Sequence, residues 1–293
     1  MAELQRAPLG RSLFAGVLVG LAARAFGADA GVSRAAGLTV GAATWRTVAT
    51  AAQLEREVRA SQDGSIVGAR LGADCPPLGT WAIEADFAEL LTVELQKRPN
   101  VVVELGSGVS TLVVAQQLNA LGSGRLVSVE HEEEYAASTR HRLERSGLGG
   151  AVELIHAPLV AQEFGGHEVE WYDLTPIRAA LGDDPIDLLI VDGPPSITPL
   201  ARWPAVAALG RKLRAGGVIM LDDGRAKYER AIARRWPLEQ PDLELYWQDT
   251  VKGTWKLVRS AGSESASTKR ARRAATALNP RPSGFGRWPV RRA

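Results

Sequence analysis

The sequence predicts a doubly wound α/β domain with a helical leader before it and a basic tail after it. From about residue 81 to residue 259, short apolar runs rich in β-branched residues alternate with longer segments of helical periodicity. Such runs are typical of parallel strands that are buried on both faces, and the segments between them supply helical crossovers. Because these crossovers are right-handed, the helices are expected on both faces of the sheet.

The expected strands and helices follow one another regularly along the domain. The expected strands are short and rich in apolar residues; they are Asn100–Leu105, Arg125–Glu130, Ala151–His156, Ile186–Val191 and Gly217–Leu221, with a closing pair at Leu243–Trp247 and Thr254–Arg259. The expected helices have apolar residues at three- and four-residue spacing; they are Phe87–Lys97, Thr111–Leu121, Glu132–Arg145, Ala201–Leu213 and Ala226–Arg235. Residues around His167 are expected to form a Gly-rich, acidic loop.

Composition divides the 293 residues into a leader (1–78), a folded domain (79–261) and a tail (262–293). The 45% hydrophobic content excludes a chain that is disordered throughout. The tail is rich in Ser, Ala, Pro and Arg and is expected to be disordered. It carries eight basic residues and one Glu although the whole chain has a net charge of only +2, so the body is acidic. The basic tail therefore gives no firm indication of a nucleic-acid partner.

The leader contains an apolar run, residues 12–23, with Arg6 and Arg11 before it and Arg24 after it. The run is short for a membrane-spanning helix, which needs ~20 residues. An amphipathic helix on the protein or a partner, contact with a membrane surface, and a secretory signal all remain open. The single cysteine, Cys75, excludes an internal disulfide and fits a reducing compartment. We expect a cytoplasmic protein, with peripheral membrane association and homo-oligomerisation left open.

A glycine loop follows the first expected strand: Glu104-Leu-Gly106-Ser-Gly108-Val-Ser110-Thr111. Glycine lets the backbone turn sharply and lets a ligand approach where a Cβ would collide. Ser110 or Thr111 can cap the helix that follows. Ligands bind at the carboxyl ends of strands in doubly wound sheets, so this loop is a candidate binding loop, although a purely structural turn would use the same residues.

A carboxylate, Glu130, ends the second expected strand. It can accept two hydrogen bonds from a ribose diol, which indicates a nucleoside ligand. A dinucleotide loop would have a third glycine where Thr111 stands, so the pattern disfavours NAD. S-adenosylmethionine fits better, because Glu104 just before the glycines can engage its ammonium group.

Four segments together resemble the class I S-adenosylmethionine-dependent methyltransferases: VVVELGSGVSTLVVA, LVSVEHEEEYAASTRHRL, IDLLIVDGPPS and LRAGGVIMLDDGRAKYE. They are most similar to a bacterial group with ELGSG-ST and VDGPP motifs. The resemblance covers residues 81–259 and implies a Rossmann-like, mostly parallel sheet with a C-terminal antiparallel hairpin. It implies that the methionine end, the ribose and the adenine of the cofactor lie near Glu104, Gly106, Gly108, Ser110, Glu130, His156, Ala157 and Asp192.

Three carboxylates follow the fourth and fifth expected strands: Asp192, Asp222 and Asp223. Neighbouring strand ends lie ~5 Å apart, so these side chains can converge. Carboxylates held together repel one another unless they are protonated or neutralised by a cation, and oxygen ligands favour Mg²⁺ or a similar divalent ion. The arrangement is similar to the metal site of O-methyltransferases that act on catechols or sugars, which implies catalytic roles for Asp192 and Asp222. Asp192 facing substrate without metal, and simple turn capping, remain alternatives.

The sequence offers no obvious general base, because Gly193, Pro194 and Pro195 follow Asp192. Lys227 and His167 are candidates, and activation by a metal would make a base unnecessary. The leading hypothesis is an O-methyltransferase acting on a hydroxyl of a small sugar or phenol. A non-catalytic nucleoside-binding or scaffold module and, on the basic tail alone, a nucleic-acid methyltransferase are the alternatives. Trp171 is expected to pack in the core, whereas for Trp81 packing and a lid role are both open.

Overall fold

The computed structural model describes residues 38–39, 82–195 and 200–261. The expectations for the leader, its apolar run at 12–23, Trp81 and the tail fall outside these residues. No helix among the described residues is both long and apolar enough to cross a membrane.

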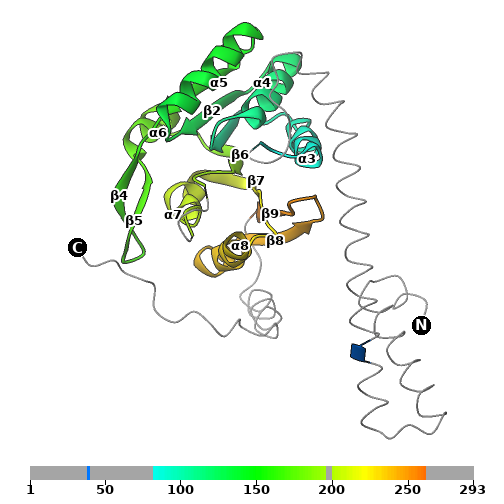
Figure 1. Cartoon of the computed structure of the whole chain (residues 1–293), viewed down its shortest axis with the longest axis vertical. Helices are drawn as coiled ribbons and strands as arrows, with labels where there is room; N and C mark the ends of the chain where they lie inside the picture. The colour runs from blue at the N-terminus through cyan, green and yellow to red at the C-terminus, as the bar shows by residue number, and fades with distance from the viewer. Residues whose placement is uncertain (1–37, 40–81, 196–199, 262–293) are drawn as a thin grey trace, which may run out of the picture.

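Seven strands form one sheet in the order β3-β2-β1-β6-β7-β9-β8 (Figure 1). The first five in this order run parallel to one another, and β9 and β8 are antiparallel to their neighbours. The strands are β1 (Val101–Leu105), β2 (Arg125–Glu130), β3 (Val152–His156), β6 (Ile186–Val191), β7 (Leu213–Leu221), β8 (Leu243–Gln248) and β9 (Thr254–Arg259). The predicted α/β sheet and its C-terminal antiparallel hairpin are therefore confirmed.

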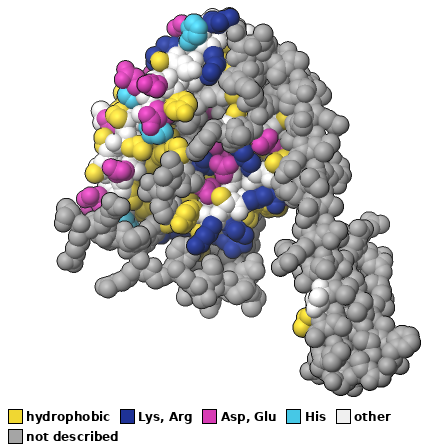
Figure 2. All heavy atoms as spheres, in the orientation of Figure 1, with side chains coloured by type: hydrophobic (Ala, Val, Ile, Leu, Met, Phe, Trp, Pro, Cys, Tyr) yellow, Lys and Arg dark blue, Asp and Glu magenta, His cyan; other side chains and the backbone are white. Residues whose placement is uncertain are grey.

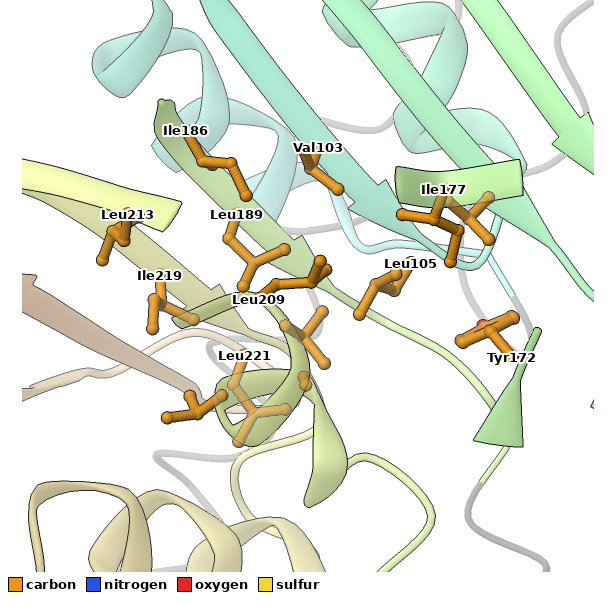
Figure 3. Packing of buried hydrophobic residues seen from close by; sticks show 14 of the residues in the cluster. Val103, Leu105, Tyr172, Ile177, Ile186, Leu189, Leu209, Leu213, Ile219 and Leu221 are labelled. Carbon is orange, nitrogen blue, oxygen red and sulfur yellow. The ribbon is translucent and has the colours of Figure 1, made fainter. Parts of the chain in front are cut away.

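Helices cover both faces of this sheet. They are α3 (Ala85–Leu95), α4 (Val109–Leu121), α5 (Glu133–Arg145), α6 (Leu174–Leu181), α7 (Pro204–Leu209) and α8 (Lys227–Glu239). Alternate residues of β6 enter different cores: Leu188 and Ile190 pack with α3 and α4, while Leu189 packs in the core that includes α6, α7 and α8 (Figure 3). This two-sided burial explains why the β-branched runs in the sequence are continuous rather than alternating.

One expectation about the chain between β3 and β6 is wrong. Residues around His167 do not form a loop; they belong to an antiparallel hairpin of β4 (Leu159–Phe164) and β5 (His167–Tyr172), followed by α6. Gly165 and Gly166 form its turn, and both have positive φ angles, as a tight hairpin turn requires. In Figure 1 the hairpin stands apart from the main sheet, on the side of α6 and α7.

The helix expected at Ala201–Leu213 is much shorter than predicted. Pro204 occupies its first turn, α7 ends at Leu209, and a 3₁₀ turn (Gly210–Lys212) leads into β7. Strand β7 accordingly begins at Leu213, before the two glycines at which the sequence suggested its start.

Candidate active site

The candidate site lies at the carboxyl ends of β1, β2, β6 and β7. The sheet order reverses direction between β1 and β6, which is where ligands bind in doubly wound sheets. The loops after these two strands touch there: a Cβ on Gly106 would lie 3.0 Å from the nitrogen of Gly193, and a Cβ on Gly193 would lie 2.9 Å from Cα of Gly106. Only glycine at both positions allows this approach.

Glu104 lies at the base of the glycine loop and is fully buried. Its Oε2 accepts hydrogen bonds from the hydroxyls of Thr111 and Ser128, both at 2.6 Å, whereas its Oε1 has no hydrogen-bond partner among the described residues. Burial raises the pKa of Glu104 to about 7, although hydrogen bonds from the neighbouring hydroxyls oppose this effect. A buried carboxylate with a free oxygen suits a cationic group on a ligand.

The helix after the loop, α4, begins at Val109, two residues before the expected start at Thr111. Thr111 Oγ1 accepts a hydrogen bond from the backbone nitrogen of Gly108 at 2.9 Å, which satisfies one donor at the start of α4. Ser110 is buried, and its hydroxyl is one of the groups that hydrogen-bond to Glu104. Ser110 therefore lies behind the loop, supporting Glu104.

Two glycines of the loop are expected to respond differently to substitution. Gly106 has φ +93° and is hemmed in by Gly193, so Gly106→Ala should lower thermal stability. A Cβ on Gly108 would meet no atom within 4 Å, so Gly108→Ala should leave the melting temperature unchanged and weaken S-adenosylmethionine binding only. Thermal denaturation and calorimetric titration of both variants test this difference. Equal melting temperatures for the two variants would contradict the close loop contact.

Glu130, at the end of β2, is already held by protein donors. Its Oε2 accepts from the backbone nitrogen of Ser107 at 3.0 Å, and its Oε1 accepts from the backbone nitrogens of His131 at 2.7 Å and Glu132 at 3.0 Å. Burial alone would raise the pKa of Glu130, but the hydrogen bonds from these residues outweigh burial and lower it. The ionised carboxylate of Glu130 thus holds the glycine loop in place. Its position at the end of a strand in the sequence did not indicate this role.

The two residues predicted to border an adenine lie next to Glu130. His156 is paired with Glu130 in the β2–β3 register, is exposed, and places Nε2 3.1 Å from the carbonyl of His131. Ala157 is fully buried, and its nitrogen donates to the carbonyl of Glu130 at 2.7 Å. The structure brings both residues to the edge of the candidate cofactor site, while their contact with adenine stays a prediction.

The three aspartates converge as expected. One carboxylate oxygen from each of Asp192, Asp222 and Asp223 lies within 4.8 Å of the other two. Burial raises the pKa of Asp192 to about 6, and burial followed by repulsion from Asp192 and Asp223 raises the pKa of Asp222 well above its usual value. Both carboxylate oxygens of Asp222 are buried without a hydrogen-bond partner in the described chain. We call these three residues the acidic cluster.

A buried arginine that the sequence analysis did not single out lies against the acidic cluster. Arg202 Nη2 is 2.9 Å from Asp223 Oδ2 and 3.3 Å from Asp192 Oδ1. A second cation, Lys252 from the turn between β8 and β9, places Nζ 3.8 Å from Asp223 Oδ1. In Figure 2, acidic and basic side chains adjoin each other near the middle of the visible face.

The donor set of the acidic cluster fits a divalent cation. Carboxylate oxygens are the ligands that such an ion prefers, and Asp222 offers two that nothing else in the described chain engages. Arg202 takes one oxygen each from Asp192 and Asp223, which leaves the second oxygen of Asp192 for another cation, while the second oxygen of Asp223 faces Lys252 at 3.8 Å.

Two residues proposed as bases, and one tryptophan, occupy distinct places. Lys227 begins α8, with Nζ 5.7 Å from the centre of the Tyr228 ring. His167 begins β5 and packs its ring edge-on against Trp203. Trp171 is fully buried and packs against Phe164, which confirms that it is a core residue.

Tyr172, the neighbour of Trp171, is a further residue at the site. This side chain is fully buried at the end of β5, and its Oη has no hydrogen-bond partner among the described residues. A Cβ on Gly193 would lie 2.5 Å from that oxygen, so Tyr172 packs directly against the contact between the β1 and β6 loops. Its place beside Gly193 was not predicted, because the hairpin that carries it was not expected.

Comparisons with known proteins agree with this geometry. Residues 103–224 match the family model described as a methyltransferase domain. A catechol O-methyltransferase from Mycobacterium tuberculosis is 28% identical over 193 residues, which are 61% of this chain and 77% of the relative.

Two solved structures are also similar to this chain. The O-methyltransferase TomG from Streptomyces achromogenes, solved in complex with SAM, is 20% identical, with 69% of this chain and 89% of that chain covered and a TM-score of 0.47. The O-methyltransferase from Bacillus cereus, solved in complex with SAH, is 18% identical, with 71% and 90% covered and a TM-score of 0.46. The matched family region runs from within β1 to just past the acidic pair after β7, so it includes Glu104, Glu130 and the acidic cluster, and the match supports a class I S-adenosylmethionine-dependent methyltransferase domain.

Proposed function

We propose that this protein transfers the methyl group of S-adenosylmethionine to a hydroxyl group of a small phenol or sugar. The observation that carries the proposal is the place of the acidic cluster, directly beside the glycine loop. Asp192 precedes Gly193, the residue that packs against Gly106, so a cofactor on the loop and an acceptor at the cluster would be neighbours. The catechol O-methyltransferase relative supports a hydroxyl acceptor.

The residues of the site suggest a division of tasks. Glu104 would pair with the ammonium group of the cofactor, and the open space at Gly108 would let the cofactor come close to the loop backbone. Glu130 would hold the loop and face the ribose. Asp192 and Asp222 would orient the acceptor. A divalent cation, when bound to the acidic cluster, would lower the pKa of the acceptor hydroxyl.

The transfer itself is a displacement. The acceptor oxygen forms a bond to the methyl carbon as the bond from that carbon to the sulfonium sulfur breaks, and the sulfur becomes a neutral thioether. The acceptor loses its proton to solvent or to a carboxylate of the site. The protein contributes chiefly by placing the oxygen and the methyl group in line.

Methyl transfer from labelled S-adenosylmethionine to a panel of catechols, phenols and sugars tests the proposal. Label on the oxygen of at least one acceptor is the expected result. Cofactor binding with no transfer to any hydroxyl would favour a nucleoside-binding module instead.

Binding of S-adenosylmethionine is expected to weaken as the pH falls. The pKa of Glu104 is about 7 in the folded protein, so below that pH a proton must leave before the carboxylate can pair with an ammonium group. The dissociation constant should rise by up to about tenfold for each pH unit below the pKa. Glu104→Gln should bind more weakly at pH 8 and lose most of this dependence. Parallel calorimetric titrations of both proteins check this, and the same pH dependence in both would remove Glu104 from the role.

The raised pKa also affects the protein without ligand. The folded state holds a proton on Glu104 between its usual pKa of 4.5 and about 7, a range in which the unfolded state has lost it. This group's contribution to stability is therefore present below that range and is lost as the pH rises through it. Glu104→Gln should flatten this part of the stability profile.

A further inference from the structure

Arg202 lies in the segment between β6 and α7, and only 3% of it is exposed. The residue after it is firmly anchored to α8: Trp203 donates from Nε1 to Glu239 Oε1 at 2.8 Å, and Trp236 donates from Nε1 to the carbonyl of Trp203 at 2.9 Å. The guanidinium therefore starts from a fixed point in the core and reaches toward the ends of β6 and β7.

The guanidinium binds three backbone carbonyls at those strand ends. Nη2 donates to the carbonyl of Asp192 at 2.8 Å, Nη1 to that of Asp222 at 3.2 Å, and Nε to that of Pro194 at 3.3 Å. The first and last of these carbonyls flank Gly193, which packs against the glycine loop. One side chain thus joins β6, β7 and the turn that meets the cofactor loop.

The same group also binds two of the three acidic side chains, Asp192 and Asp223. A planar guanidinium presents five N–H donors in a fixed fork, so it can set the direction of several oxygens at once. A lysine ammonium could supply the charge but not this geometry. Because three carboxylates without a nearby cation would repel one another, the buried charge of Arg202 also lets them stay close.

We propose that Arg202 is the positioning residue of the acceptor site: its guanidinium fixes the carboxylates of Asp192 and Asp223 and ties their strand ends to the turn at Gly193. The inference rests on the proposed function, because it assigns the acidic cluster to the acceptor. Arg202 acts through these carboxylates and does not itself touch the reacting atoms.

Two substitutions separate geometry from charge. Arg202→Lys keeps a positive charge and loses the fork, and Arg202→Met loses both. Misplacement of the acceptor by about 1 Å can reduce a rate about 100-fold, so Arg202→Met should lower kcat by about this factor and Arg202→Lys by about tenfold. The affinity for S-adenosylmethionine, measured by calorimetry, should stay within about threefold of wild type in both, because the glycine loop and Glu130 belong to β1 and β2.

The matched control is Arg214→Met. Arg214 pairs with Asp187 and so joins the same two strands, β6 and β7, at their opposite ends. If Arg202 served stability alone, the loss of kcat in Arg202→Met and in Arg214→Met would follow the loss of melting temperature in each variant. The inference expects Arg214→Met to retain full kcat, and a loss of kcat in Arg214→Met equal to that in Arg202→Met would overturn it.

Chemical rescue gives a readout that does not depend on turnover. Arg202→Ala leaves a cavity beside two carboxylates, and guanidinium chloride at millimolar concentration should raise the melting temperature of this variant, whereas urea at the same concentration should not. The same guanidinium should restore part of the kcat. Absence of both effects in an Arg202→Ala protein that binds S-adenosylmethionine would overturn the inference. Guanidinium stabilisation together with a wild-type protein that methylates no hydroxyl would instead overturn the proposed function alone.

Discussion

Replacing Asp222 by Asn is expected to reduce methyl transfer about 100-fold or more, the scale on which a displaced reactant slows a reaction. Both oxygens of Asp222 are buried and unengaged in the described chain, so the variant removes the negative charge best placed to bind a cation or to accept a hydrogen bond from an acceptor hydroxyl. A chelator should abolish turnover of the wild-type enzyme, and Mg²⁺ should restore it. Steady-state rates with and without chelator measure both effects.

Cofactor binding should survive the same substitution, because Glu104, Gly108 and Glu130 belong to other strands. The melting temperature should not fall, since Asp222→Asn removes one of three mutually repelling carboxylates. Asp183→Asn, at an exposed position before β6, is the control and should match wild type. Full activity in the presence of the chelator would show that the acidic cluster works without a metal, and Asp192 would then be the candidate base.

Gly193→Ala is the substitution with the largest expected effect on stability. The new Cβ would lie 2.5 Å from Tyr172 Oη, 2.9 Å from Cα of Gly106 and 3.1 Å from the nitrogen of Gly106. Overpacking of this kind costs about 1–3 kcal/mol, and here the displaced backbone belongs to the cofactor loop. We expect a lower free energy of unfolding in urea and no measurable binding of S-adenosylmethionine.

Two further variants make this result specific. A Cβ at Gly150 would meet no atom within 4 Å, so Gly150→Ala should retain both stability and binding. Adding Tyr172→Phe to Gly193→Ala removes the nearest contact and leaves the backbone contact with Gly106. The double variant should therefore regain part of the stability but not the binding. Recovery of binding in the double variant would mean that Tyr172, and not the meeting of two loops, sets the constraint.

The sheet could be predicted because its strands are buried on both faces. Val101–Val103 and Leu188–Val191 are apolar without interruption, and each of these runs is followed by a polar residue that the parallel order then brings to the same edge of the sheet. Glu104, Asp192 and Asp222 could be placed at one edge for this reason alone. The hairpin of β4 and β5 was also within reach, because Gly165-Gly166 suits a two-residue hairpin turn and residues 168–171 after it alternate between polar and apolar.

The roles of Arg202 and Tyr172 could not be read from the sequence. Arg202 is ten residues from Asp192 and twenty from Asp222, and its contacts exist only because the segment between β6 and α7 places it against the ends of β6 and β7. The hydrogen-bond partners of Glu130 also could not be predicted from the sequence. Its position was predicted, but the donors that occupy its oxygens come partly from Ser107, on the loop of a neighbouring strand.

The order of the strands has a consequence for how such a domain could diversify. The groups suited to the cofactor come from the first half of the domain, through β1 and β2, and the acidic cluster with Arg202 comes from the second, between residues 192 and 223. At the site itself the two halves meet at Gly106, Gly193 and Tyr172, whereas below it β1 pairs along its length with β6. Changes confined to the loops after β6 and β7 would therefore alter acceptor preference while the strands and the nucleoside-binding half are inherited unchanged.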